Sequence, residues 1–320
     1  MRQTITLLAG QFAQMFLVLL IAPLLTGIVR RVKARFMRRL GAPIWQPYVD
    51  LVKLLRKESV LADNASWLFR AAPYVIFAFA WVAAALVPSF AAGLMFNWAA
   101  DVVALVALLG AARAMLALAG MDIGTSFGGI GSSREMMIAT LAEPALLLVF
   151  LTLALLAGST RLPEIANHFI STPPTIRVSL ALALVAFVIV ALAENARIPV
   201  DNPATHLELT MVHEAMVLEY SGRHLALIEA AAQLKIVTYL GLIVCLFVPW
   251  GMAPADAGPV TWLVGLIAWV AKLCAGAALL GAWEVNIAKM RVFRLPDFLG
   301  IAFVFAFLAI LMAFVTRAVL

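Results

Sequence analysis

"ITLLAGQFAQMFLVLLIAPLLTGIVRRVKARFMRR", residues 5–39, decides the fold class of this chain. Its first part is an apolar run long enough to cross a bilayer, which takes about 20 residues. The run is too long for the h-region of a signal peptide, and it ends in a basic cluster instead of a small-residue cleavage site. We therefore expect a membrane span with a basic flank.

The rest of the chain has the same apolar character. Of its 320 residues, 65% are hydrophobic and only 12% are charged, whereas a soluble domain has about 25% charged residues. We predict a single all-α polytopic membrane domain over residues 1–320 with eight transmembrane helices. Their expected bounds are about 5–28, 71–91, 99–121, 136–158, 177–196, 225–249, 260–283 and 296–317.

Lysine and arginine are distributed unevenly between the spans. Ten lie between the first and second spans and three between the seventh and eighth, but the connections after the second and sixth spans have none. The positive-inside rule then places the odd-numbered connections in the cytoplasm and both termini outside the cell (inner) membrane. The net charge of +6 reflects this asymmetry, and it does not indicate a nucleic-acid site.

Two cytoplasmic connections have distinctive compositions. Residues 43–60, "PIWQPYVDLVKLLRKESV", place apolar side chains on one helical stripe and charged ones on the other, which predicts an amphipathic helix in the membrane interface. This helix is either a lipid anchor or a ledge on which a cytoplasmic partner docks. Residues 122–135, "DIGTSFGGIGSSRE", are rich in Gly and Ser, and they predict a loop with tight turns. We find no internal repeat of the kind that many transporters have.

Several charged residues fall inside the predicted spans, where each costs a few kcal/mol on insertion scales. They are Arg113, Glu143, Glu194, Glu229, Lys235, Lys272 and Glu284. Pairing between adjacent helices, for example of Arg113 with Glu143, would explain some of them, because a buried charge needs a partner.

Residues 194–224, "ENARIPVDNPATHLELTMVHEAMVLEYSGRH", resist that explanation. The stretch holds five of the seventeen acids and three of the four histidines, but only Arg197 and Arg223 as local cations. Crowded carboxylates near lipid favour one another's protonated form, so the cluster suits a proton path. Its apolar residues alternate too densely for a solvated loop, and we expect a short acidic helix or loop over about 197–224, between spans five and six.

A metal site is the competing interpretation of this stretch. His206, Glu208, His213 and Glu214 are candidate ligands, but their spacing differs from HExxH, which places two imidazoles on one helical face. Cys245 and Cys274 lie in separate apolar spans, and clustered cysteines that could hold an iron–sulfur centre are missing. We therefore expect neither metal nor cofactor in this chain.

Four stretches together resemble a known family. They are "RRLGAPIWQPYVDLVKLLRKE", "SSREMMIATLAEP", "AENARIPVDNPATHLELTMVHEAMVLEYSG" and "AKMRVFRLPDFLG". The chain resembles the membrane-anchor subunit shared by respiratory complex I, where it is the first or H subunit, and by group 4 [NiFe] hydrogenases. The hydrogenase version is called hydrogenase-4 component C or formate hydrogenlyase subunit 4.

The resemblance favours the hydrogenase branch. Complex I usually has further acids where this chain has Ala204 and His206, and the gap from Glu208 to Glu219 is about three residues longer than in the quinone enzymes. The resemblance implies an anchor that binds a hydrogenase-like large subunit and an iron–sulfur small subunit. Those partners would hold iron–sulfur clusters, and the large subunit would be either a nickel–iron protein or a nickel-free homologue. It also implies antiporter-like membrane subunits that move H⁺ or Na⁺. A quinone-site subunit of complex I and a stand-alone ion-coupled transporter remain alternatives.

Two sets of site residues are predicted from the resemblance and from the positions of residues within 194–224. The expected proton path consists of Glu143, Glu194, Asp201, Glu208, His213, Glu214 and Glu219. The expected docking surface for the peripheral arm consists of Gln46, Asp50, Lys53, Lys57, Gly128, Gly129, Arg134 and Arg197.

Overall fold

The computed structural model describes residues 2–93, 95–171, 177–197, 212–254, 258–287 and 294–319. In these ranges the regular secondary structure is helical, and the only β pairing is two isolated bridges. The predicted all-α class is therefore confirmed.

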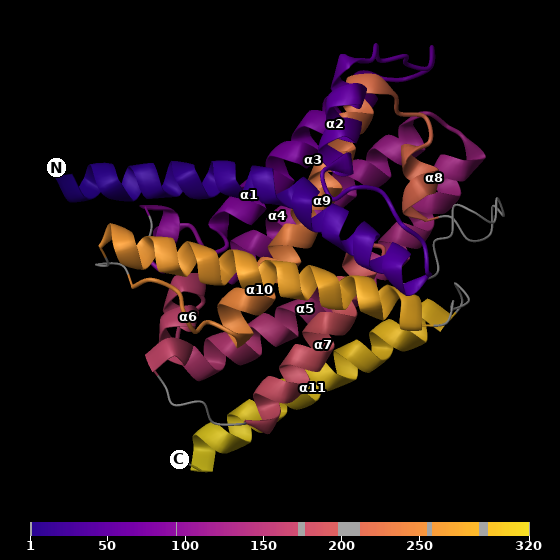
Figure 1. Ribbon diagram of the computed structural model, residues 1–320. Helices are drawn as coiled ribbons and strands as arrows, with labels where there is room; N and C mark the ends of the chain where they lie inside the picture. The colour runs from indigo at the N-terminus through magenta and orange to yellow at the C-terminus, as the bar shows by residue number, and fades with distance from the viewer. Residues whose placement is uncertain are drawn as a thin grey trace.

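Seven of the helices in the described ranges are long and apolar enough to cross a membrane. They are α1 (Arg2–Phe36), α3 (Trp67–Leu86), α4 (Val102–Asp122), α5 (Ser126–Ala157), α9 (Gly222–Phe247), α10 (Pro259–Asn286) and α11 (Leu295–Val319). The fifth predicted span corresponds to α7 (Val178–Glu194), which has 17 residues, about the least that can cross. The N- and C-terminal ends lie on the same side of the bundle (Figure 1), as an even number of crossings requires.

In the described part of the chain, four short helices lie between the long ones. They are α2 (Gln46–Arg56), the 3-10 turn η1 (Met95–Trp98), α6 (Leu162–Ser171) and α8 (His213–Val217). α2 falls inside the predicted amphipathic segment 43–60, and α8 is a short helix in the predicted acidic segment. α6 has no counterpart among the sequence predictions.

The loop predicted over residues 122–135 is wrong for most of its length, because α5 begins at Ser126. Thr125 caps this helix, and its Oγ1 accepts a hydrogen bond from the backbone nitrogen of Gly128 at 3.2 Å. The glycines here allow helices to approach closely. A Cβ on Gly128 would lie only 2.0 Å from the carbonyl oxygen of Gly120 on α4.

Two neighbouring glycines on α5 give a matched test of this packing. Gly128→Ala is expected to destabilise the chain by about 1–3 kcal/mol, because the new methyl group forces α4 and α5 apart. Gly129→Ala meets no atom within 4 Å, and it should be neutral or stabilising by up to about 1 kcal/mol, because alanine favours helices. Thermal unfolding in detergent measures both variants. Equal stability of the two variants would show that α4 and α5 can accommodate a methyl group at position 128.

Two apolar cores meet at α9. One core joins α4, α5, α7 and α11 to α9 through side chains such as Tyr239 and Leu242. The other core joins α1, α3 and α10 to α9 through Leu234 and Val237. α9 is therefore the central helix of the fold, and a charged residue on it can reach groups on either side.

Polar side chains cap two helix ends that lie within the bundle. The Nε2 atom of Gln14 on α1 donates to the carbonyl oxygens of Ala85 and Val87, at 3.0 and 2.7 Å, where α3 ends. Lys272 on α10 donates to the carbonyl oxygens of Val248 and Trp250, where α9 ends. Because lipid offers no hydrogen bonds, such carbonyls need partners from the protein. This capping accounts for Lys272, one of the charged residues in a predicted span.

Candidate functional site

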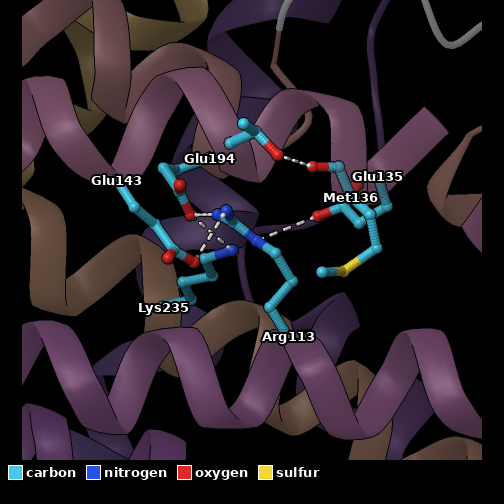
Figure 2. A network of polar contacts seen from close by, with 7 residues as sticks. Arg113, Glu135, Met136, Glu143, Glu194 and Lys235 are labelled. Atoms are coloured by element: carbon cyan, nitrogen blue, oxygen red, sulfur yellow. Dashed lines mark hydrogen bonds and ion pairs between the residues drawn. The ribbon is translucent and has the colours of Figure 1, made fainter. Parts of the chain in front are cut away.

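Arg113 on α4 is the centre of a buried ion cluster. Its Nε atom lies 3.2 Å from Oε1 of Glu135, and its Nη1 atom lies 3.5 Å from Oε1 of Glu143. Its Nη2 atom pairs with Oε2 of Glu194. Figure 2 shows the three carboxylates converging on one guanidinium from two other helices. The predicted pairing of Arg113 with Glu143 is therefore one part of a larger network.

Packing of the helices brings these groups together. Glu135 and Glu143 are eight residues apart on α5, which places them on the same face of the helix. Glu194 is the last residue of α7. On α4 the residue opposite Glu143 is Gly110, where a Cβ would lie 3.2 Å from Oε1 of Glu143. The lack of a side chain at Gly110 leaves room for this carboxylate.

Lys235 on α9 completes the cluster, with its Nζ atom 3.1 Å from Oε2 of Glu194. Arg113 and Lys235 bring two positive charges, and the three glutamates bring three negative ones. The cluster therefore has a formal charge of −1 when every acid is ionised. Uptake of one proton makes it neutral, and in a low-dielectric interior the neutral state is favoured. The arrangement is suited to hold and release a proton.

The members of the cluster differ in exposure. The side chains of Arg113 and Glu194 are 3% and 2% exposed, whereas that of Glu143 is 39% exposed. Oε1 of Glu194 has no hydrogen-bond partner within the described ranges. Glu194 is thus the most deeply buried acid of the group, and Glu143 is the one that reaches the surface of the bundle.

A charged cavity of about 320 Å³ adjoins the cluster. Helices α1, α3, α4, α5, α8 and α9 and the turn after α7 contribute to its wall. Its ionisable lining residues are Arg30, Arg113, Glu135, Glu194, Arg197, His213, Glu214, Glu229 and Lys235. Because both signs of charge surround a space of this size, the cavity can hold water between the groups.

The cavity gathers some of the predicted path residues and leaves others out. Glu194, His213 and Glu214 line it, whereas Glu143 joins through Arg113. Glu219 is exposed and is absent from the lining. Asp201 and Glu208, and with them His206, lie outside the described residues.

The predicted proton path left out three acids that the structure places at or beside the site. Glu135 was assigned to a loop, although its spacing from Glu143 is that of one helical face. Glu229 lines the cavity. Glu284 on α10 pairs with Arg197 at 3.0 Å and with Lys33 at 3.1 Å. The sequence marks Glu229 and Glu284 only as charged residues inside apolar spans, and it does not show what they contact.

The four expected docking residues on α2 and at its C-terminal end fall into two groups. Gln46 donates to Oδ1 of Asp50 at 2.9 Å, and Asp50 pairs with Arg30 of α1 at 3.4 Å. These contacts tie α2 to α1. Lys53 and Lys57 are exposed, so they present positive charge on the outer side of α2.

The other expected docking residues have varied surroundings. Gly128 is buried against α4, while Gly129 and Arg134 are partly exposed on α5. Arg197 is paired with Glu284. Of this second set, Arg134 and Gly129 are the ones that a partner can reach without moving the helices.

Tyr220, which precedes α9, is held firmly. Its hydroxyl donates to the carbonyl oxygen of Phe69 at 3.0 Å, and the two rings stack with centroids 3.9 Å apart. Burial, and after it the charge of Asp122, raise the pKa of Tyr220 well above its ordinary value. The phenol therefore stays protonated and fixes the segment between α8 and α9 against α3.

Within the described ranges, three or more His, Cys, Asp or Glu side chains are nowhere gathered as a metal site would need. The two candidate ligands that are described, His213 and Glu214, lie on the wall of the charged cavity. The chemistry that this arrangement supports is the movement of protons between carboxylates.

The chain matches the family model described as NADH dehydrogenase over residues 10–316. It is 34% identical to hydrogenase-4 component C of Escherichia coli (strain K12) over 315 residues, covering 97% of this chain and 98% of the relative. Over 290 residues it is 34% identical to formate hydrogenlyase subunit 4 of the same strain, covering 90% of this chain and 93% of the relative.

A relative with a quinone-related name is more distant. NADH-quinone oxidoreductase subunit 8 of Thermus thermophilus is 29% identical over 260 residues, covering 75% of this chain and 68% of the relative. Among solved structures, a chain of the membrane-bound sulfane sulfur reductase, an archaeal respiratory membrane complex, superposes with a TM-score of 0.80. That match covers 95% of this chain and 99% of the other, and at 19% identity it shows the fold alone. The chain therefore belongs to the NADH dehydrogenase family, as the four sequence stretches predicted.

Proposed function

We propose that this chain is the membrane-anchor and coupling subunit of a complex-I-like, membrane-bound hydrogenase complex. The observation that carries the proposal is the ion cluster around Arg113, whose formal charge of −1 lies beside a charged cavity. The relatives named as hydrogenase-4 component C and formate hydrogenlyase subunit 4, which match nearly the whole chain, support the choice of complex.

In this proposal protons move through the chain in two steps. A redox event in the peripheral arm changes the charge at the cavity, and Glu194 then takes up or releases a proton. Arg113 keeps its own protons, but Glu194 and Glu143 share its guanidinium, so a proton gained by Glu194 strengthens the pairing of Arg113 with Glu143 and favours release of a proton from Glu143. Asp201, Glu208, His213, Glu214 and Glu219 remain candidates for the route between the arm and Glu194.

Glu143 also indicates where a membrane partner would bind. Its half-exposed side chain lies on a face of α5 that includes the exposed residues Met136, Thr140, Pro144 and Leu151. A carboxylate facing lipid at this depth is costly. An antiporter-like membrane subunit that covers this face would remove that cost and receive the ion movement.

The peripheral arm in this proposal consists of a hydrogenase-like large subunit and an iron–sulfur small subunit on the cytoplasmic side. Iron–sulfur clusters and nickel–iron would belong to those partners. Exposed lysines on α2 and Arg134 on α5 support a basic docking surface there.

Reversing two charges tests this docking surface. The double variant Lys53→Glu, Arg134→Glu is expected to release the arm from membranes, because like charges then face each other at the contact. The measurement is the fraction of redox activity that sediments with membranes, with Arg161→Glu as the matched control on another surface. Arm subunits that stay bound to the double variant would make α2 a lipid anchor only. Purification without any soluble metalloprotein would favour the stand-alone transporter.

The orientation has its own test. Single cysteines introduced at Ser126 and His206 should be protected from a membrane-impermeant thiol reagent in intact cells, while one at Asn97 should react. The reason is the excess of lysine and arginine in the odd-numbered connections. Reaction of the Ser126→Cys variant from outside would reverse the orientation and with it the side on which the arm docks.

A quinone-site function is the second candidate, and one observation favours it. A nearly apolar cavity of about 180 Å³ lies between α2 and helices α1, α3 and α9. It shares Leu51 and Gln233 with a smaller cavity lined by Arg30 and Glu229, two residues that also line the charged cavity. A lipophilic molecule could use this route. Reduction of an added quinone by the purified complex, lost in Phe77→Trp, would favour this alternative.

A further inference from the structure

Glu284 binds two cations that come from distant parts of the chain. Its Oε2 atom accepts from Nζ of Lys33 on α1 at 3.1 Å, and its Oε1 atom accepts from Nη1 of Arg197 at 3.0 Å. The Glu284 side chain is 7% exposed, whereas those of Lys33 and Arg197 are 43% and 23% exposed. A carboxylate buried to this extent is stable only while it is paired.

Close packing of α1 on α10 brings Lys33 of α1 to Glu284 of α10. A Cβ on Gly281, one turn before Glu284, would lie 3.0 Å from the carbonyl oxygen of Val29 and 3.1 Å from Cβ of Val32. The two helices therefore touch at this level. Glu284 itself is held by α1, and it offers its second oxygen to Arg197.

The turn that carries Arg197 is strained. After α7 the backbone nitrogen of Arg197 donates to the carbonyl oxygen of Leu192 at 2.9 Å, which closes the helix end. This closure places Ala196 in the left-handed region, with φ of 51°. Glycine is the usual residue there, and alanine costs about 1 kcal/mol more. Contacts from the surrounding structure help to hold a strained turn of this kind in place.

We propose that Glu284 is a positioning residue for the charged cavity, acting through Arg197. By holding Arg197 it fixes the turn 195–197, and this turn continues directly from Glu194, the most deeply buried acid of the ion cluster. Asn195, Ala196 and Arg197 all line the cavity, so the same contact also sets part of the cavity wall. The effect on ion movement rests on the proposed function, whereas the positioning of the turn does not.

Lys33 provides the matched control. It occupies the other oxygen of Glu284 and is more exposed than Arg197. Lys33→Gln removes one ion pair but leaves the contact between Glu284 and Arg197. Glu284→Gln removes both ion pairs while keeping nearly the same shape.

Hydrogen exchange in the assembled, detergent-solubilised complex tests the positioning. Mass spectrometry follows the peptide that contains residues 195–197, with a peptide of α6 as the internal reference. In Glu284→Gln the exchange of these amides should speed up at least about tenfold, while Lys33→Gln should change it less than about twofold. The triple variant Lys33→Glu, Arg197→Glu, Glu284→Arg reverses all three charges, and it should restore slow exchange.

Ion translocation by the same variants gives a second measurement. Glu284→Gln should reduce translocation by at least about threefold and leave the dye-linked redox activity of the arm unchanged. Unchanged exchange at 195–197 in Glu284→Gln would overturn the inference, and so would equal effects of Glu284→Gln and Lys33→Gln. Faster exchange with normal translocation would overturn the link from the turn to the path. The proposed function fails separately, if Glu194→Gln translocates ions normally.

Discussion

Replacing Glu194 with glutamine is expected to stop ion translocation while the dye-linked redox activity of the peripheral arm stays intact. The change removes the one acid that pairs with both Arg113 and Lys235. With glutamine in its place, the cluster has two positive and two negative charges and no longer needs a proton. Glutamine has nearly the same shape and can keep hydrogen bonds to its neighbours, so the fold should persist.

The expected loss is at least about tenfold, which corresponds to ~1.4 kcal/mol at the barrier of the slowest step. Translocation is measured with the complex in sealed vesicles, from the pH change or the dye-reported membrane potential. Glu164→Gln is the control, because Glu164 is exposed on α6 and pairs only with Arg161 among the described residues. If Glu194→Gln translocates ions like Glu164→Gln, the buried cluster is structural.

The geometry of the site alters the expected order in which Glu→Gln changes reduce ion translocation. Sequence similarity alone favours Glu208 and Glu219 as the critical acids of the loop. Glu219 is exposed and away from the cavity lining, so Glu219→Gln should have a smaller effect than Glu194→Gln. The effect of Glu135→Gln on ion translocation should lie between these two. Glu135 pairs with Arg113 but makes no ion pair with Lys235 among the described contacts.

Replacing Arg113 with methionine is expected to cause the largest loss of stability. The guanidinium is 3% exposed and pairs with all three glutamates. Without it, Glu135 and Glu143 lose the cation that the structure gives them, and Glu194 keeps only Lys235. Leaving buried charges without a partner costs about 3–5 kcal/mol, which for a chain of 320 residues is a decrease of roughly 4–8 °C in the unfolding temperature.

Thermal unfolding of the detergent-purified protein measures this loss. Arg161→Met is the control, since its pair with Glu164 is half exposed and such surface pairs contribute less than about 1 kcal/mol. Adding Glu135→Gln and Glu143→Gln to Arg113→Met should recover at least half of the lost stability, because the unpaired charges are then removed as well. A decrease no larger than that of Arg161→Met would mean that water already screens the cluster.

The sequence by itself predicted the all-α class and the order of the long apolar helices, seven of which in the described ranges are long enough to cross a membrane. Transfer of an apolar run into lipid is a local property of about 20 residues, so runs such as 5–28 and 225–249 predict their helices without knowledge of the rest of the chain. A charged residue inside such a run can also be recognised locally, because it interrupts the apolar sequence. The family resemblance then identified Glu143 and Glu194 as candidate path residues.

Only the tertiary structure decided which charges meet. Glycines in 122–135 indicated a loop locally, but their contacts with α4 and α8 made them part of a helix, and this concealed Glu135. Glu284 meets Arg197 and Lys33 across 87 and 251 residues of sequence. Such pairs depend on how three helices pack, and the energy of an ion pair depends on distance and burial. Neither quantity is encoded in the spacing of residues along one helix.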